Sequence, residues 1–300
     1  MDGRFEVVFL GTGSPLDQSG HRCGAGQVVV AGETHVLVDC GWGAARRLRP
    51  SGIVPALIDV ALFTHMHTDH ITDVPDFLFQ RWTSGATKPL QVFGPEGTAE
   101  MMEGFLLALR RDIGYRKAHH GDKLHPDGIR AEVTEPPVTK RPATFLELGG
   151  LRFESFEVDH YPVVPAFGYR AVFEGRSLVL SGDTVFCETL AEAAKGTDML
   201  VCEALNLPMI DEVIAMLKAA GREREASLLG DVPSYHIETN EVARLAREAE
   251  VGELVLSHLI PPVLNDSERE AAFVEGMDGI YGGRIRVARD MQRIPVTKRA

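Results

Sequence analysis

The sequence predicts an α/β protein in which two β-sheets pack together and helices cover their outer faces. Short apolar and β-branched runs typical of strands dominate both halves of the chain. Stretches with helical spacing of apolar residues lie between some of these runs. The chain has 300 residues, of which 44% are hydrophobic and 25% charged, so it can bury a sizeable core. No repeat, low-complexity tract or linker is evident, and we expect one domain over residues 1–300.

In the first part of the chain, turn residues separate the apolar runs. The first run ends in a Gly-Thr-Gly-Ser-Pro cluster, and Gly32-Glu33 separates the next two runs. We expect strands at Phe5–Leu10, Gln27–Ala31, His35–Asp39 and Val60–Phe63. Helical spacing of apolar residues predicts an amphipathic helix at Ala99–Arg111.

The second part repeats this pattern with helices between strand-like runs. We expect strands at Leu151–Val158, Phe167–Phe173, Leu178–Ser181, Met199–Cys202 and Glu253–Ser257. A helix is expected at Glu238–Glu250, because Thr239 and Asn240 followed by Glu241 make a helix start. A further helix is expected at Ile210–Ala220.

Composition excludes several classes of protein. The formal net charge is −12, which argues against a broad surface for nucleic acid, although a local basic patch stays possible. No run reaches the ~18–20 apolar residues that a membrane span needs, and the N-terminus lacks the pattern of a secretory signal. The four cysteines show no CxxC spacing and indicate neither a disulfide framework nor a cysteine zinc site. We therefore expect a cytoplasmic protein without a membrane partner.

A dense group of metal-binding residue types follows the fourth expected strand. Residues 65–70 read His-Met-His-Thr-Asp-His. On an extended strand end, His65 and His67 point the same way because side chains alternate, and the next turn can aim Asp69 and His70 at a second point. Imidazole and carboxylate groups suit zinc or a similar divalent ion. A solvated polar turn is the alternative, but four such groups after an apolar strand favour a metal site.

This segment resembles the His-x-His-x-Asp-His signature of the metallo-β-lactamase superfamily, and the resemblance extends along most of the chain. Later segments are similar to motifs of its ribonuclease Z and arylsulfatase-like branch, in the expected order. Cys202 stands where this branch usually has a histidine. The similar segments are Pro89–Glu96, Val158–His160 with Ala166–Arg170, Leu180–Thr184, Val201–Ala204, and His236 with Leu254–His258.

The resemblance implies an αββα sandwich of two mixed sheets and a site for two divalent ions. His65, His67 and His160 would hold one ion, Asp69, His70 and His258 the other, and Asp183 would bridge them. Zinc is the expected metal, and Mn²⁺ or Fe²⁺ would fit the same ligands. Taken alone, His160 and His258 are ordinary loop or strand-end histidines; it is their sequence context that makes them candidates.

The resemblance also implies a hydrolase in which a hydroxide bridging the metals attacks an ester. We expect His236 to act as general acid or transition-state stabiliser, oriented by Glu203, and Asp69 to be able to shuttle a proton. The alternative is that His236 caps the following helix and Glu203 forms a buried ion pair.

The substrate is less well defined, because one fold supports many reactions. The short form of ribonuclease Z has an arm that grips tRNA between the two motifs around Tyr169 and Asp183, and here only thirteen residues separate these positions. With the acidic composition, this favours a small phosphodiester, phosphotriester or aryl sulfate. The alternatives are a ribonuclease Z-type tRNA 3'-processing endonuclease and a lactone or thioester hydrolase.

Three further segments bear on specificity. Apolar residues of a helix leaving the metal motif, which Asp73-Val74-Pro75 would start, are expected either to line a pocket or to belong to the core: Phe77, Leu78, Phe79 and Trp82. A basic cluster would steer an anionic substrate or form a solvated face: Arg110, Arg111, Arg116, Lys117 and Lys123. Residues 205–235 form a connection that is longer than a minimal loop. This segment would serve as a lid or as a contact in the homodimer that we expect.

Overall fold

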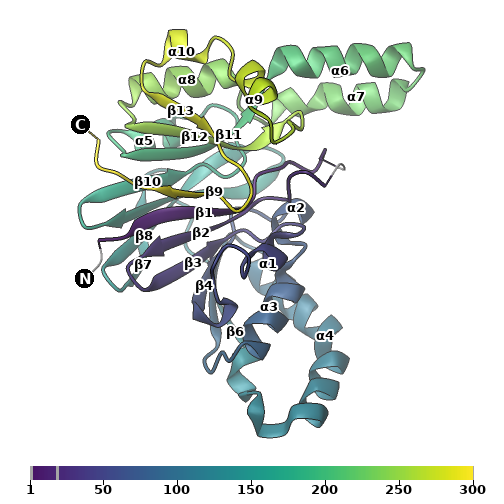
Figure 1. Cartoon of the computed structure of the whole chain (residues 1–300), viewed down its shortest axis with the longest axis vertical. Coiled ribbons are helices and arrows are strands. Elements are labelled where there is room, and N and C mark those ends of the chain that lie inside the picture. The colour runs from purple at the N-terminus through teal and green to yellow at the C-terminus, as the bar shows by residue number, and fades with distance from the viewer. Residues whose placement is uncertain (1–2, 18–19, 300) are drawn as a thin grey trace.

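Two mixed sheets of seven strands stack face to face, and helices cover their outer faces (Figure 1). This computed structural model describes residues 3–17 and 20–299. The arrangement confirms the predicted fold class, an αββα sandwich. Among the described residues, no helix is both long and apolar enough to cross a membrane.

Sheet A comes mainly from the first half of the chain and has the order β14-β1-β2-β3-β4-β5-β6. Pairing is antiparallel from β14 to β3 and parallel from β3 to β6. Strands β3 and β4 of the parallel part are rich in apolar residues because both of their faces are covered. Its strands are β1 (Phe5–Gly11), β2 (Gly26–Ala31), β3 (Thr34–Val38), β4 (Ile58–Leu62), β5 (Leu90–Phe93), β6 (Ala131–Thr134) and β14 (Arg293–Pro295).

Sheet B has the order β13-β12-β11-β10-β9-β8-β7. Pairing is antiparallel from β7 to β10 and parallel from β10 to β13. Its strands are β7 (Ala143–Leu148), β8 (Leu151–His160), β9 (Val163–Phe173), β10 (Arg176–Leu180), β11 (Met199–Leu205), β12 (Glu253–Ile260) and β13 (Arg284–Val287). The predicted strands of both halves are confirmed, with ends that differ by a few residues.

Three apolar layers hold the sandwich together. The central layer lies between the sheets and includes Phe9, Val29 and Phe167. A second layer joins sheet A to its helices, and a third joins sheet B to its helices. In the β-strands, alternate side chains enter different layers, so each covered strand is apolar on both faces.

The helices divide between the two sheets (Figure 1). On the side of sheet A lie α1 (Ala44–Arg47), α2 (Thr68–Ile71), α3 (Val74–Thr83) and α4 (Thr98–His120), with the 3₁₀ turns η1 (Pro55–Leu57), η2 (Gly121–Lys123) and η3 (Pro126–Ile129). On the side of sheet B lie α5 (Glu188–Ala194), α6 (Leu207–Ala219), α7 (Glu223–Asp231), α8 (Thr239–Glu248), α9 (Ser267–Phe273) and α10 (Met277–Ile280), with η4 (Val232–Ser234).

Two helical segments extend beyond the sandwich (Figure 1). Helix α4 runs away from sheet A, and the α6–α7 hairpin projects from sheet B. The expected helices at 210–220 and 238–250 are confirmed as α6 and α8, and α3 begins after Asp73 as expected. The expected end of α4 at Arg111 is wrong, because the helix continues to His120 and ends at Gly121 with φ of 56°. Its apolar spacing fades there, but Arg, Lys and Ala still favour helix.

Candidate metal centre

The segment that follows β4 places four of the candidate ligands at one end of the sandwich. Thr64 fixes this segment, since its backbone N–H and its hydroxyl both donate to the carboxylate of Asp39 at 2.9 Å. His67 has extended backbone and precedes α2, whose first turn contains Asp69. His65 Nε2 lies 3.0 Å from His67 Nδ1, so the two imidazoles point the same way, as strand alternation predicts.

Sheet B brings the remaining candidates to the same end. His160 ends β8, Asp183 follows β10, and His258 lies in β12. His258 has φ of 50° beside a register shift between β11 and β12, and this bulge changes the direction of its side chain. Gly182 has φ of 63°, and a Cβ there would lie 2.7 Å from the carbonyl oxygen of Phe167. Only glycine fits this turn, which presents Asp183 to the histidines.

The structure gathers these side chains into two adjacent groups. In each group, the ligand atoms lie within 4.8 Å of one another. Asp183 Oδ2 lies 3.4 Å from both His70 Nε2 and His258 Nε2, and 3.9 Å from His65 Nε2, so it faces both groups. The first group is His65, His67, His160 and Asp183, and the second is Asp69, His70 and His258. These are the sets that the sequence resemblance implies.

The electrostatics of the two groups suit cations. Burial lowers the pKa of His65 well below its usual value and that of His160 to about 4, so both rings are neutral and have a free lone pair. Burial opposes a charge on His258 as well, but Asp183 and Asp69 outweigh it and raise its pKa. The carboxylates of Asp69 and Asp183 thus favour positive charge beside them, on an imidazolium or on a divalent ion.

The donor set fits divalent metal ions. Histidine nitrogens and carboxylate oxygens are the groups that zinc, manganese and iron bind. His70 Nε2 is buried without a hydrogen-bond partner among the described residues, and it faces the carboxylates of Asp69 and Asp183. A buried imidazole nitrogen that lies 3.4–3.5 Å from two carboxylate oxygens and makes no regular hydrogen bond leaves an arrangement that a divalent ion would complete.

His236 and Glu203 meet beside this cluster. His236 Nδ1 lies 2.6 Å from Glu203 Oε2, and both side chains are buried. Burial and the nearby charge of Asp183 raise the pKa of Glu203 well above its usual value, and burial lowers the pKa of His236. His236 also forms a third compact group with Asp183 and His258, so it borders the candidate metal site as well as the cavity described below.

Sequence reasoning missed three partners of the candidate ligands. Asp39 Oδ2 lies 2.9 Å from His70 Nδ1, and the backbone carbonyl of Tyr235 lies 2.9 Å from His160 Nδ1. The Thr64 hydroxyl lies 3.0 Å from His65 Nδ1. Such contacts fix the tautomer and direction of a ligating imidazole. In the sequence, the one signal for these partners was the position of Asp39 at the end of an apolar run. In the structure, Asp39 has a φ of 57°, which is an uncommon backbone conformation for a residue other than glycine.

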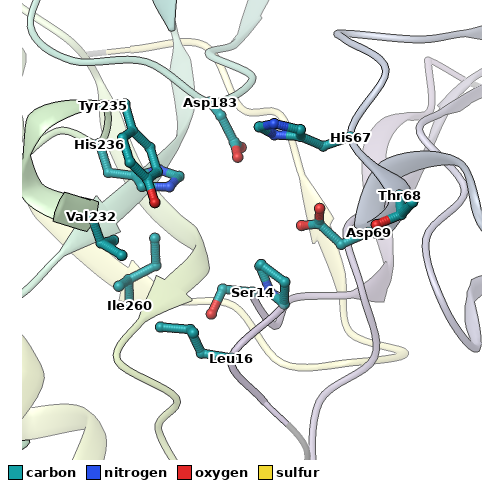
Figure 2. Close-up of a pocket in the computed structure, with 11 residues that line it drawn as sticks. Ser14, Leu16, His67, Thr68, Asp69, Asp183, Val232, Tyr235, His236 and Ile260 are labelled. Atoms are coloured by element: carbon teal, nitrogen blue, oxygen red, sulfur yellow. The ribbon is translucent and has the colours of Figure 1, made fainter. Parts of the chain in front are cut away.

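A cavity of about 260 Å³ opens onto the cluster (Figure 2). His67 and Asp69 lie on one side, and Tyr235 and His236 lie on the other. The remaining wall is partly apolar: Pro15, Leu16, Val232 and Ile260. The aromatic side chains of α3 do not line this cavity, and their alternative assignment to the core is correct, because they pack against sheet A: Phe77, Leu78, Phe79 and Trp82.

Comparison with known proteins identifies the family of the chain. The family model described as "Beta-lactamase superfamily domain" matches residues 34–259. The chain belongs to the β-lactamase superfamily. Within this superfamily, it is 36% identical to ribonuclease Z of Mycolicibacterium paratuberculosis over 97% of this chain and 98% of that protein. The resemblance to the superfamily and to ribonuclease Z is thus confirmed.

Comparison with solved structures confirms the fold. The metallo-β-lactamase fold protein YhfI from Bacillus subtilis has a TM-score of 0.70 and 17% identity, covering 97% of this chain and 99% of YhfI. The short form of human tRNase Z has a TM-score of 0.68 and 18% identity, with coverage of 97% and 99%. At these identities the likeness shows the fold alone.

Proposed function

We propose that this protein is a metal-dependent endonuclease of the ribonuclease Z type, which hydrolyses a phosphodiester bond at the 3' side of tRNA in a precursor RNA. The observation that carries this proposal is the similarity to ribonuclease Z along nearly the full length of both chains. This proposal differs from the expectation from the sequence, which favoured a small ester over tRNA as the substrate. Net charge is an average over the whole chain, whereas phosphates contact local patches, so acidity was a weak argument against RNA.

The two groups of side chains give each candidate ligand a role in this proposal. His65, His67 and His160 would hold one divalent ion, Asp69, His70 and His258 a second, and Asp183 would contact both. Two such ions would polarise the phosphodiester and supply a hydroxide nucleophile near neutral pH. Zinc suits the nitrogen-rich donor set best, and manganese or iron is compatible with it.

His236 is the proposed proton donor to the leaving oxygen. Glu203 is bonded to Nδ1 of its ring, which leaves Nε2 as the nitrogen able to act in the cavity. Burial lowers the pKa of His236, so the ring is mostly neutral at rest. In this proposal it takes up the proton released by the attacking water and passes it to the leaving oxygen. Asp69 also lines the cavity, and in this proposal it helps to transfer the proton of the attacking water. The contact with Glu203 supports the expected orienting role of that residue over helix capping.

A precursor tRNA with a 3' extension tests this proposal. We expect a single cut at the 3' side of the tRNA, loss of cutting after chelation, and close to two divalent ions per chain by elemental analysis. The same preparation should be assayed with bis(p-nitrophenyl) phosphate, a phosphotriester, an aryl sulfate and an acyl ester. Intact precursor beside rapid turnover of one small ester would overturn the proposal, as would full activity without metal.

A small phosphodiester or aryl sulfate is the second candidate, and one observation favours it. Strands β9 and β10 are joined by the two-residue turn Glu174-Gly175, so no arm extends from this connection. An RNA substrate then needs cationic side chains elsewhere on the protein.

A further inference from the structure

Helix α4 has a continuous exposed face that is rich in cations. Residues on this face follow the spacing i, i+3, i+4 and i+7, and all of them are exposed. We define the α4 basic face as Leu107, Arg110, Arg111, Gly114, Lys117 and, beyond the helix end, Lys123. Between positions 107 and 125 the chain has five Lys or Arg residues and two carboxylates, a net charge of +3 in a protein of −12.

The cations of this face are not engaged in structural contacts. Among the described residues, the side chains of Arg110, Arg111, Lys117 and Lys123 form no hydrogen bond or ion pair. The fifth cation differs, because Arg116 pairs with Asp112 at 2.9 Å and lies 4.7 Å from the Phe79 ring centroid. Arg116 therefore anchors the helix, while the other four remain available to a ligand.

Helix electrostatics do not account for the cluster. A cation in the last turn offsets the negative end of the helix dipole, and this explains Lys117. Arg110 and Arg111 lie about two to three turns before the helix end, where the dipole has little effect. A solvated face needs no such excess of one sign, and neighbouring cations repel each other. The excess of one sign thus points to an anionic ligand.

The distance of the α4 basic face from the candidate metal centre favours a long ligand. Helix α4 starts after β5, whose end pairs with Phe63 next to the metal motif. From Thr98, the rise of 1.5 Å per residue places Arg110 and Lys117 about 18 and 28 Å along the helix axis. Figure 1 shows α4 running away from both sheets. An ester held at the metal centre is too small to contact this face, but a folded RNA carries phosphates over such a distance.

From these observations we infer that the α4 basic face binds the phosphate backbone of a folded RNA while the metal centre receives its 3' end. This inference rests on the proposed function. Arg110, Arg111, Lys117 and Lys123 contact phosphates, and Gly114 leaves room for close approach of the strand. Tyr115, which is 62% exposed, offers a ring on which an unpaired base can stack. The contacts depend on charge and shape rather than on sequence.

The test compares two variants that lose the same four charges. The first carries Arg110→Gln, Arg111→Gln, Lys117→Gln and Lys123→Gln. The matched control carries Arg49→Gln, Lys218→Gln, Arg224→Gln and Arg244→Gln, which are exposed cations elsewhere. Gln has a helix propensity close to that of Lys and Arg, so both variants should keep the melting temperature of the wild type.

Equilibrium binding of labelled precursor tRNA is measured from 50 to 300 mM salt. We expect the α4 variant to bind about tenfold or more weakly at 150 mM salt, with the slope of log K against log salt reduced by about 3. The control should stay within about twofold of the wild type, and all three proteins should hydrolyse bis(p-nitrophenyl) phosphate equally. Equal RNA binding by both variants would overturn the inference, as would a wild-type protein that binds anionic vesicles but not RNA.

A cleavage assay with the precursor distinguishes a failure of this inference from a failure of the proposed function. If the wild type cuts the precursor and the α4 variant cuts it with unchanged KM, the function stands and the inference fails. If RNA binding depends on the α4 basic face but no cut occurs, the inference stands and the ribonuclease proposal fails.

Discussion

The two sheets contribute to the metal centre in different ways. Sheet A supplies four candidate ligands from the single segment 65–70, which follows one strand. Sheet B supplies His160, Asp183 and His258 from three separate strands or strand ends. The first set is recognisable as a local pattern, whereas the second is meaningful only after strands distant in the chain have paired.

The projecting segments differ in the same way. Helix α4 lies between two strands of sheet A and has its cations far from the candidate metal centre. The α6–α7 hairpin follows Glu203 and precedes His236, so its two ends lie near the residues of the proposed catalytic pair. Residues 207–231 contain three cations and five carboxylates. Changes at the hairpin base should therefore affect turnover of every substrate, whereas changes on α4 should affect only substrates long enough to reach it.

The largest effect is expected for His236→Ala. Removing the proposed proton donor should lower kcat by about 10²- to 10⁴-fold for RNA and for bis(p-nitrophenyl) phosphate alike. Metal content, measured by elemental analysis, should stay near that of the wild type. Loss of one ion per chain would instead make His236 a ligand, in line with its group with Asp183 and His258.

The sheet A side is tested by Asp39→Ala. His70 would lose the carboxylate that orients its ring, and we expect metal affinity to fall about 10- to 100-fold in a competition titration with a chelator. Asp198→Ala is the matched control, because Asp198 is also buried but bonds Ser177 away from the cluster. An equal loss of metal affinity in both variants would point to general destabilisation.

The smallest effect concerns two neighbouring leucines of the hairpin. Leu229 is buried against Ile210 and Val232, and Leu229→Ala should lower the free energy of unfolding by about 2–3 kcal/mol. Leu228 is 57% exposed, and Leu228→Ala should change it by less than about 0.5 kcal/mol. Urea denaturation measures both values. Similar values for the two variants would show that the hairpin packs differently in solution.

The regular parts of the fold were predictable because hydrophobic periodicity reflects burial directly. The buried strands β1 to β4 and β8 to β12 each correspond to an expected apolar run. The short edge strands β6, β7 and β13 were not expected, since their partly exposed side chains give no clear alternation. The extension of α4 was missed for a similar reason, because its distal turns have little apolar surface to bury.

The site was predictable where residue type alone carries the chemistry. Histidines and carboxylates in a metal-binding pattern stand out in a sequence, and the structure gathers all seven candidates. Asp39 did not stand out, because a single aspartate after a strand is common and its bond to His70 crosses 31 positions. The aromatic residues of α3 illustrate the opposite case, since the same apolar pattern is compatible with a pocket wall and with a core.

The sequence by itself determined the α/β class, the local His-rich segment and the likeness to one superfamily, because these depend on neighbouring residues and on motif order. The tertiary structure decided which side chains face one another: the position of Asp183 between two groups, the contact of Glu203 with His236, and the support of His70 by Asp39. It also decided that the cations of α4 form one exposed face far from the metal centre. These features depend on strand pairing, which brings residues from distant parts of the chain within a few ångströms of one another. They also depend on helix direction, which places the α4 cations tens of ångströms from the site.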